Sequence, residues 1–128
     1  MKIFAAAALM LPLLAAPALA QQFPREFQGE WMAESDEPSV CKPGAFDRME
    51  SDAIMKITAR DTSQIESGCQ LKGFKGQTFG ASVRLACSGE GSTWQVNEIW
   101  SVRKVAGRTL LITASAKDSR ISVLAKCE

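Results

Sequence analysis

The most regular alternation of apolar and polar side chains lies at residues 79–87. Every second position there is apolar, and these positions share one face of an extended chain: Phe79, Ala81, Val83, Leu85 and Cys87. A period of two residues is typical of a β-strand that buries one side. The pattern therefore predicts a strand whose apolar face, including Phe79, points into a core.

The stretch that follows repeats this pattern. Residues 88–92, Ser-Gly-Glu-Gly-Ser, predict a turn by composition. Beyond the turn, apolar residues again alternate with polar ones: Trp94, Val96, Trp100 and Val102. These two segments predict consecutive strands, and Ala106-Gly107 predicts the next turn.

Five further segments are strand-like and separated by polar turns: residues 28–33, 53–58, 64–74, 108–114 and 121–127. Asp61 and Thr62 are expected to interrupt the chain between the second and third of these. Residues 34–52 are polar and acidic, which predicts a long loop with room for one short helical turn. Because short strands recur with turns between them, the sequence predicts an all-β antiparallel meander, closed or half-closed into a small barrel.

The N-terminus carries an export signal. Lys2 precedes an apolar stretch broken only by Pro12, and Ala18-Leu19-Ala20 has the small-x-small pattern that signal peptidase reads. A membrane anchor needs roughly 20 apolar residues, and this run is shorter. We expect cleavage after Ala20, so that residues 1–20 are a signal peptide and residues 21–128 form a single disulfide-stapled domain in the periplasm or the medium.

All four cysteines lie in this predicted domain: Cys41, Cys69, Cys87 and Cys127. An even number of cysteines in an exported chain predicts two disulfides. A zinc site built from four thiolates is the alternative. The spacings contain no CxxC pair, however, and the chain has no histidine. We therefore expect no metal and no other cofactor.

The order of the strands predicts how the cysteines pair. If seven strands alternate up and down, Cys69 and Cys87 lie opposite each other in one hairpin whose turn is near Thr78. Cys41 follows the upper end of the first strand, and the seventh strand rises to Cys127. A Cys87–Cys127 bond would span the barrel, beyond the roughly 4.4 to 6.8 Å allowed between Cα atoms. We predict Cys41–Cys127, which closes a loop of about 87 residues and contributes about 4 kcal/mol, and Cys69–Cys87.

The residue types argue against an enzyme. Histidine is absent, paired cysteines leave no thiolate, and no nucleophile-elbow, Walker or dinucleotide motif occurs. A carboxylate pair is the remaining option. Glu98 lies in phase with Trp94 and Trp100, where burial would raise its pKa and let it act as an acid, with Glu66 or Glu90 as the second carboxylate. A slip in strand phase, or a partner arginine for Glu98, is the simpler interpretation.

Trp94 and Trp100 either fill the barrel core or line the mouth of a cavity for an apolar or sugar-like ligand. The chain has 15 basic and 14 acidic residues, and without Lys2 the two counts are equal. No basic run indicates nucleic acid, and no amphipathic helix indicates a membrane surface. We expect a protein or a small apolar ligand as the partner, with no nucleic acid and no membrane contact after cleavage.

Several fragments occur together in a characteristic order: Phe-Gln-Gly-Glu-Trp at 27–31, Ile-Glu-Ser-Gly-Cys at 65–69, Cys-Ser-Gly-Glu-Gly at 87–91 with Trp94, and a cysteine near the C-terminus. This arrangement resembles a group of small exported α-proteobacterial proteins of uncharacterised function. The resemblance covers most of the predicted mature chain. It implies a periplasmic, disulfide-bonded domain and transfers no activity.

Ser88-Gly89 followed by Trp100-Ser101, with Lys104 nearby, is similar to the inhibitory loop of the periplasmic inhibitors of c-type lysozyme. In that family, such a serine and lysine engage carboxylates of the lysozyme cleft. The chain lacks the loop's tyrosine, and Lys104 is displaced from the place directly after Ser101. Small barrel inhibitors of secreted proteases share the Gly-x-Trp opening strand, here at residues 29–31.

The sequence therefore predicts a non-catalytic binding or inhibitor module. The candidate ligand or partner residues are Ser88, Gly89, Glu90, Trp94, Glu98, Trp100 and Lys104. Two alternatives stay open: a structural or stress-related envelope protein with no discrete ligand, and a specific inhibitor of lysozymes or secreted proteases.

Overall fold

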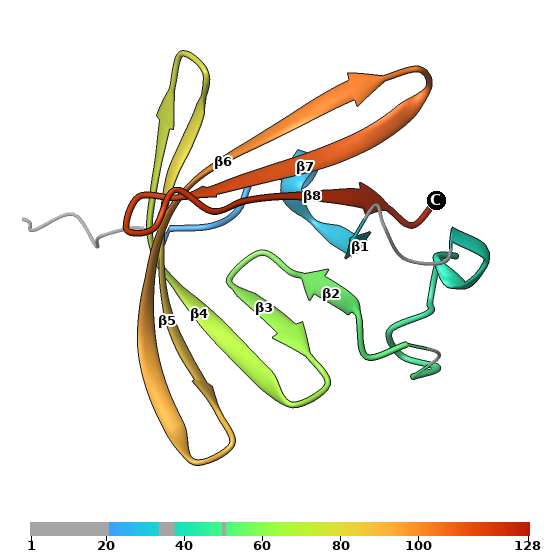
Figure 1. Ribbon diagram of the computed structural model, residues 1–128, viewed down its shortest axis with the longest axis horizontal. Coiled ribbons are helices and arrows are strands. Elements are labelled where there is room, and N and C mark those ends of the chain that lie inside the picture. Colours follow the sequence, from blue (N-terminus) through green and yellow to red (C-terminus); the bar gives the residue numbers. More distant parts are fainter. Residues whose placement is uncertain (1–20, 34–37, 50) are drawn as a thin grey trace, which may run out of the picture.

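The computed structural model describes residues 21–33, 38–49 and 51–128, and its strands close into an antiparallel barrel (Figure 1). The strands in chain order are β1 (Gly29–Ala33), β2 (Ile54–Ile57), β3 (Asp61–Gln64), β4 (Ser67–Gln77), β5 (Gly80–Gly89), β6 (Ser92–Val105), β7 (Arg108–Ser115) and β8 (Ile121–Lys126). Each strand pairs with the next, and β8 pairs with β1. The predicted all-β meander is confirmed in its closed form, while the predicted signal peptide lies outside the described residues.

The described residues contain one strand more than the sequence predicts. The expected break at Asp61 and Thr62 is wrong, because these residues begin β3. Thr62 pairs with Ile57 and Cys69 and is 5% exposed. The hydroxyl of Thr58 donates to Asp61 Oδ1 at 2.7 Å, so side chains stabilise the β2–β3 turn. A strand with no aliphatic residue gives no hydrophobic alternation by which sequence can detect it.

The predicted alternation at residues 79–87 holds for four of the five apolar residues expected to face inward. Those four are buried: Ala81, Val83, Leu85 and Cys87. Phe79 is the exception at 81% exposed, because it lies in the β4–β5 turn, outside the strand. The register between β5 and β6 gives Trp94, Val96, Glu98 and Trp100 the same inward face, opposite the buried residues of β5.

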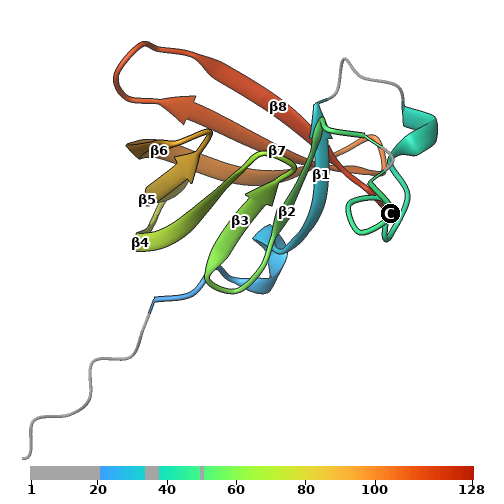
Figure 2. The same ribbon diagram turned by 90° about the horizontal axis from the view of Figure 1, so that it is seen from below.

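The segment before β1 closes one end of the barrel. Phe23 precedes the 3-10 helix η1 (Arg25–Phe27) and Phe27 ends it, and the two side chains are 1% and 3% exposed. Phe23 stacks on Trp100 with ring centroids 5.4 Å apart, and the indole N–H of Trp31 donates to the Phe27 carbonyl at 2.9 Å. In Figure 2, η1 lies beneath β1 and β2, at the lower end of the barrel. This aromatic plug encloses the core from below.

The predicted disulfides Cys41–Cys127 and Cys69–Cys87 are both confirmed. The hairpin geometry for Cys69–Cys87 is also as predicted, because these residues are direct partners in the β4–β5 register. The reasoning for Cys41–Cys127 is wrong, however. With eight strands, β8 runs antiparallel to β1 and ends beside its beginning, where Cys127 N–H donates to the Glu30 carbonyl.

Cys41 reaches that place because the β1–β2 connection folds back over the outside of the barrel. The Glu30 carboxylate accepts hydrogen bonds from the backbone N–H groups of Gly44 and Phe46. A second, smaller core forms beneath this connection from Met32, Cys41, Ala45, Ile54 and Cys127. The connection also contains the expected short helical turn, the 3-10 helix η2 (Pro38–Val40).

Candidate functional site

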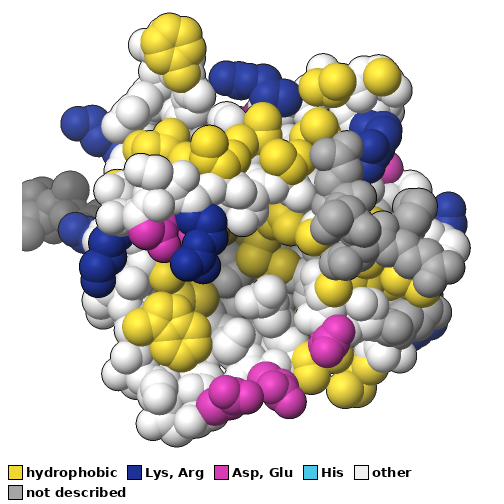
Figure 3. All heavy atoms as spheres, viewed as in Figure 1, with side chains coloured by type: hydrophobic (Ala, Val, Ile, Leu, Met, Phe, Trp, Pro, Cys, Tyr) yellow, Lys and Arg dark blue, Asp and Glu magenta, His cyan; other side chains and the backbone are white. Residues whose placement is uncertain are grey.

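The end of the barrel opposite η1 is open. The β3–β4, β5–β6 and β7–β8 turns lie at this end, and Figure 2 shows the β7–β8 turn at the upper rim. Met55, Val96 and Leu124 are each the register partner of a buried core residue, yet each stays partly exposed. Figure 3 looks into this end and shows a hollow with hydrophobic side chains inside it. The upper part of the interior is therefore accessible to solvent.

Trp94 stands at the rim of this open end. It pairs with Cys87 and so shares the inward face of β6, but 41% of it is exposed. A depression of about 380 Å³ lies against it, lined by Glu66, Ser67, Gly89, Glu90, Ser92 and Trp94. These lining residues combine one large aromatic surface with two carboxylates and two hydroxyls, and they include no lysine or arginine.

Backbone geometry fixes the two glutamates at this rim. Glu90 and Gly91 have φ angles of 49° and 77°, which makes a two-residue turn of the kind that joins strands tightly. A Cβ atom on Gly89 would lie 2.7 Å from the Glu66 carbonyl oxygen and 2.8 Å from Ser67 Cβ. Only glycine allows this close approach, so the β3–β4 and β5–β6 turns lie side by side.

Glu98 lies deeper in the wall of the barrel. Its surroundings match neither a slip in strand phase nor pairing with an arginine. The strand phase does not slip, because Glu98 still pairs with Val83 on the inward face. Its partner is the indole of Trp100, whose Nε1–H donates to Glu98 Oε2 at 2.7 Å. Trp100 is 3% exposed and stacks on Phe23. Glu98 is therefore part of the barrel wall, and Trp100 packs against the aromatic plug, although the sequence places both in phase with Trp94.

The structure brings only part of the candidate set together. Gly89, Glu90 and Trp94 line one depression, and Ser88 lies on the outward side of the same hairpin. Ser88 pairs with Thr93 near the beginning of β6, whereas Lys104 lies near the end of the same strand. Lys104 is eleven positions along the extended strand from Thr93, or roughly 35 Å away. Ser88 and Lys104 therefore do not form one surface.

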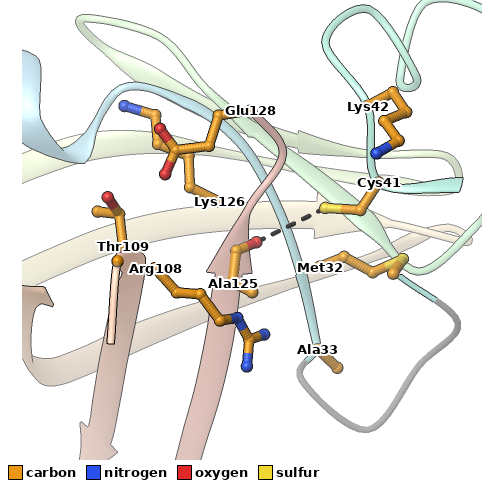
Figure 4. Close-up of a pocket in the computed structure, with 10 residues that line it drawn as sticks. Met32, Ala33, Cys41, Lys42, Arg108, Thr109, Ala125, Lys126 and Glu128 are labelled. Atoms are coloured by element: carbon orange, nitrogen blue, oxygen red, sulfur yellow. Dashed lines mark hydrogen bonds between the residues drawn. The ribbon is translucent and has the colours of Figure 1, made fainter. Parts of the chain in front are cut away.

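Sequence reasoning missed a groove of about 300 Å³ beside the Cys41–Cys127 bond (Figure 4). Its charged lining residues are Lys42, Arg108, Lys126 and Glu128. Lys126 runs across Gly29, whose φ is 125°, and holds its ammonium 5.6 Å from the Trp31 ring. Nothing in the sequence spacing indicates this groove, because it depends on the connection folding back.

Within the part of the chain that the structure describes, no helix is long and apolar enough to cross a bilayer. The same residues contain no group of three His, Cys, Asp or Glu side chains placed to hold a metal ion. No protein-family model, curated protein sequence or solved structure matches this chain.

Proposed function

We propose that this protein is a non-catalytic binding module that takes a small apolar or sugar-like ligand at the open end of its barrel. The observation that supports this most is Trp94, which faces inward but is 41% exposed. Large aromatic side chains on a concave wall, with a few polar groups beside them, are typical of ligand sites.

The rest of the barrel suits such a role. The aromatic plug fills the lower end, so a ligand has one way in and rests against a fixed base. Met55, Val96 and Leu124 offer partly exposed apolar surface inside the mouth. Glu66 and Glu90 supply hydrogen-bond acceptors at its edge. A ligand would gain free energy chiefly by covering apolar surface that the protein alone leaves wet.

The location of this activity is part of the proposal. Two disulfides and no free cysteine are consistent with an oxidising, extracytoplasmic compartment. Export through the predicted signal peptide would deliver the chain there, to the periplasm or the medium.

Fluorescence of the neutral apolar probe N-phenyl-1-naphthylamine tests the proposal. We expect saturable enhancement with the oxidised protein, and an affinity lowered about tenfold in Trp94→Ala, because the ring supplies most of the exposed apolar area at the rim. Phe79→Ala is the matched control, since Phe79 is an exposed aromatic residue in the β4–β5 turn, away from the open end. Absence of saturable uptake, or equal affinities for Trp94→Ala and the parent protein, would contradict the proposal.

The same titration separates the alternatives. A structural envelope protein with no ligand requires a filled interior and predicts no uptake. The lysozyme-inhibitor interpretation receives less support from the geometry, because Trp100 is buried and because Ser88 of β5 pairs with Thr93, at the opposite end of β6 from Lys104.

A further inference from the structure

The outer face of β5 to β8 carries an apolar surface that begins beside the β7–β8 turn and faces away from the interior of the barrel. Residues that pair across neighbouring strands share a face of the sheet. Two rows of such partners are exposed or partly exposed on the outside: Ser82, Ile99, Ala114 and Ile121, and below them Ser101, Ile112 and Val123. Figure 3 shows hydrophobic side chains gathered in a band over β6 and β7.

Two of these aliphatic side chains are exposed. Ile121 is 68% exposed and Ile99 is 39% exposed. The tips of the neighbouring hairpins extend the surface with Val105 at 53% and Phe79 at 81%. Contiguous apolar surface of this kind is unusual on a protein that stays free in solution, and it indicates a contact with another phase or molecule.

The charges on and beside this face are mostly positive, and the acidic Asp118 in the β7–β8 turn forms an ion pair with Arg120. Residues 67–89 contain three basic residues and no acidic one, and residues 99–117 contain four basic residues and no acidic one. Arg103 donates to the carbonyl oxygens of Val102 and Phe79, and Arg84 donates to the carbonyl of Lys72. Backbone carbonyls orient these two guanidinium groups without neutralising them, so the face keeps its positive charge.

We propose that this face docks the protein on an anionic lipid bilayer. Positive charge on the face complements the phosphates of such a membrane, and each arginine near the surface strengthens attachment. Arg84 and Arg103 lie on different strands, and their register partners include Asn97 for Arg84 and Leu110 for Arg103. A fluid array of lipid phosphates can adjust to charges spread in this way, whereas a folded acidic partner would need a matching shape. Phe79 and Val105 then enter the headgroup layer.

The expectation of no membrane contact rested on the lack of an amphipathic helix. A β-strand is amphipathic with a period of two, and its outward residues look like ordinary polar-to-apolar alternation in a sequence. The apolar character of this outer face can be recognised only when the four strands are aligned in register. This proposal does not rest on the proposed function, because none of the residues of this face lines the depression at Trp94.

Sedimentation with vesicles tests the proposal, using oxidised protein produced from the full-length chain. Vesicles of phosphatidylcholine alone are compared with vesicles containing an equal share of phosphatidylglycerol. We expect binding only to the anionic vesicles, weakened by salt. Arg84→Gln and Arg103→Gln should each lower the partition coefficient about fivefold. On the same anionic vesicles, Ile121→Ser should also lower the partition coefficient, because it removes exposed apolar surface from the face.

Arg60→Gln is the matched control, because it removes the same charge from the exposed β2–β3 turn, away from the face. Its partition coefficient should equal that of the parent protein. The proposal is overturned if Arg60→Gln weakens binding as much as Arg103→Gln, or if neutral vesicles bind equally well. Retention on immobilised polyglutamate through the same arginines, without vesicle binding, would overturn it in favour of an acidic protein partner.

Discussion

The two ends of the barrel differ in how they expose a tryptophan of the same strand, β6. Trp94 and Trp100 share the inward face of β6, yet Trp94 is 41% exposed and Trp100 only 3%. The difference comes from the segment before β1, whose Phe23 stacks on Trp100 at the lower end. Strand phase thus sets the direction of a side chain, while a distant segment of chain decides whether it becomes core or binding surface.

Removal of an aromatic ring at each end should give the largest contrast. Trp31→Ala deletes a fully buried side chain and the indole hydrogen bond to Phe27, and should lower the free energy of unfolding by about 4 kcal/mol. Trp94→Ala should cost about 1 kcal/mol, because much of the ring is already in water. Urea denaturation measures both. Similar losses for the two variants would mean that both ends are equally packed.

The next largest difference is expected between the two disulfides, in the free energy of unfolding that is lost when each is removed. Cys41–Cys127 links residues 86 apart and Cys69–Cys87 residues 18 apart. In the loop-entropy model, replacing the first pair by alanine should cost about 4 kcal/mol and replacing the second about 3 kcal/mol. Thermal unfolding of the two double variants under identical conditions checks the order. A larger loss for the shorter loop would show that packing around Trp94 outweighs loop entropy.

Glu98 tests whether the wall between the two ends is structural. Glu98→Gln keeps an acceptor for the Trp100 indole and should cost about 1 kcal/mol, whereas Glu98→Leu leaves a buried N–H without a partner and should cost about 2 kcal/mol. Chemical denaturation gives both values. Equal stability of all three proteins would show that the hydrogen bond contributes nothing. Loss of a hydrolytic activity in Glu98→Gln would instead revive the carboxylate-pair hypothesis.

The smallest effect is expected at the β7–β8 turn of the open rim. The backbone N–H of Arg120 lowers the pKa of Asp118, with help from the Ser115 hydroxyl and the Arg120 charge. A lowered folded-state pKa means that this contribution is present above the ordinary aspartate pKa and is lost as pH falls through the lowered value. An NMR titration of the Asp118 carboxyl carbon measures this. A midpoint at or above the ordinary value would contradict it.

The sequence predicted the barrel and the Cys69–Cys87 bond well, because β5 alternates regularly and because these two cysteines are direct partners in the β4–β5 register. It missed β3, since Asp-Thr-Ser-Gln presents no aliphatic residue to the core. It also paired Cys41 with Cys127 for a wrong reason. An error of one strand reversed the direction of β8, and the folding back of the β1–β2 connection, which no local pattern encodes, compensated for it.

The candidate site was predictable in part. The turn at residues 88–92 identified the rim hairpin, and Trp94 followed from strand phase. The contribution of Glu66 could not be weighed, because the contact between two turns depends on the close approach at Gly89. The division of Trp94 from Trp100 also required the position of Phe23. Contacts between segments far apart in sequence therefore account for what sequence alone left open.

The asymmetry of the two ends is tested most directly by NMR of the three tryptophan indole N–H groups in the presence of a soluble paramagnetic gadolinium chelate. The Trp94 signal should broaden while those of Trp31 and Trp100 persist, because only the Trp94 indole lies at the open end. N-phenyl-1-naphthylamine should then protect Trp94 alone. Equal protection of all three indoles, or equal broadening, would contradict a barrel closed at one end and open at the other.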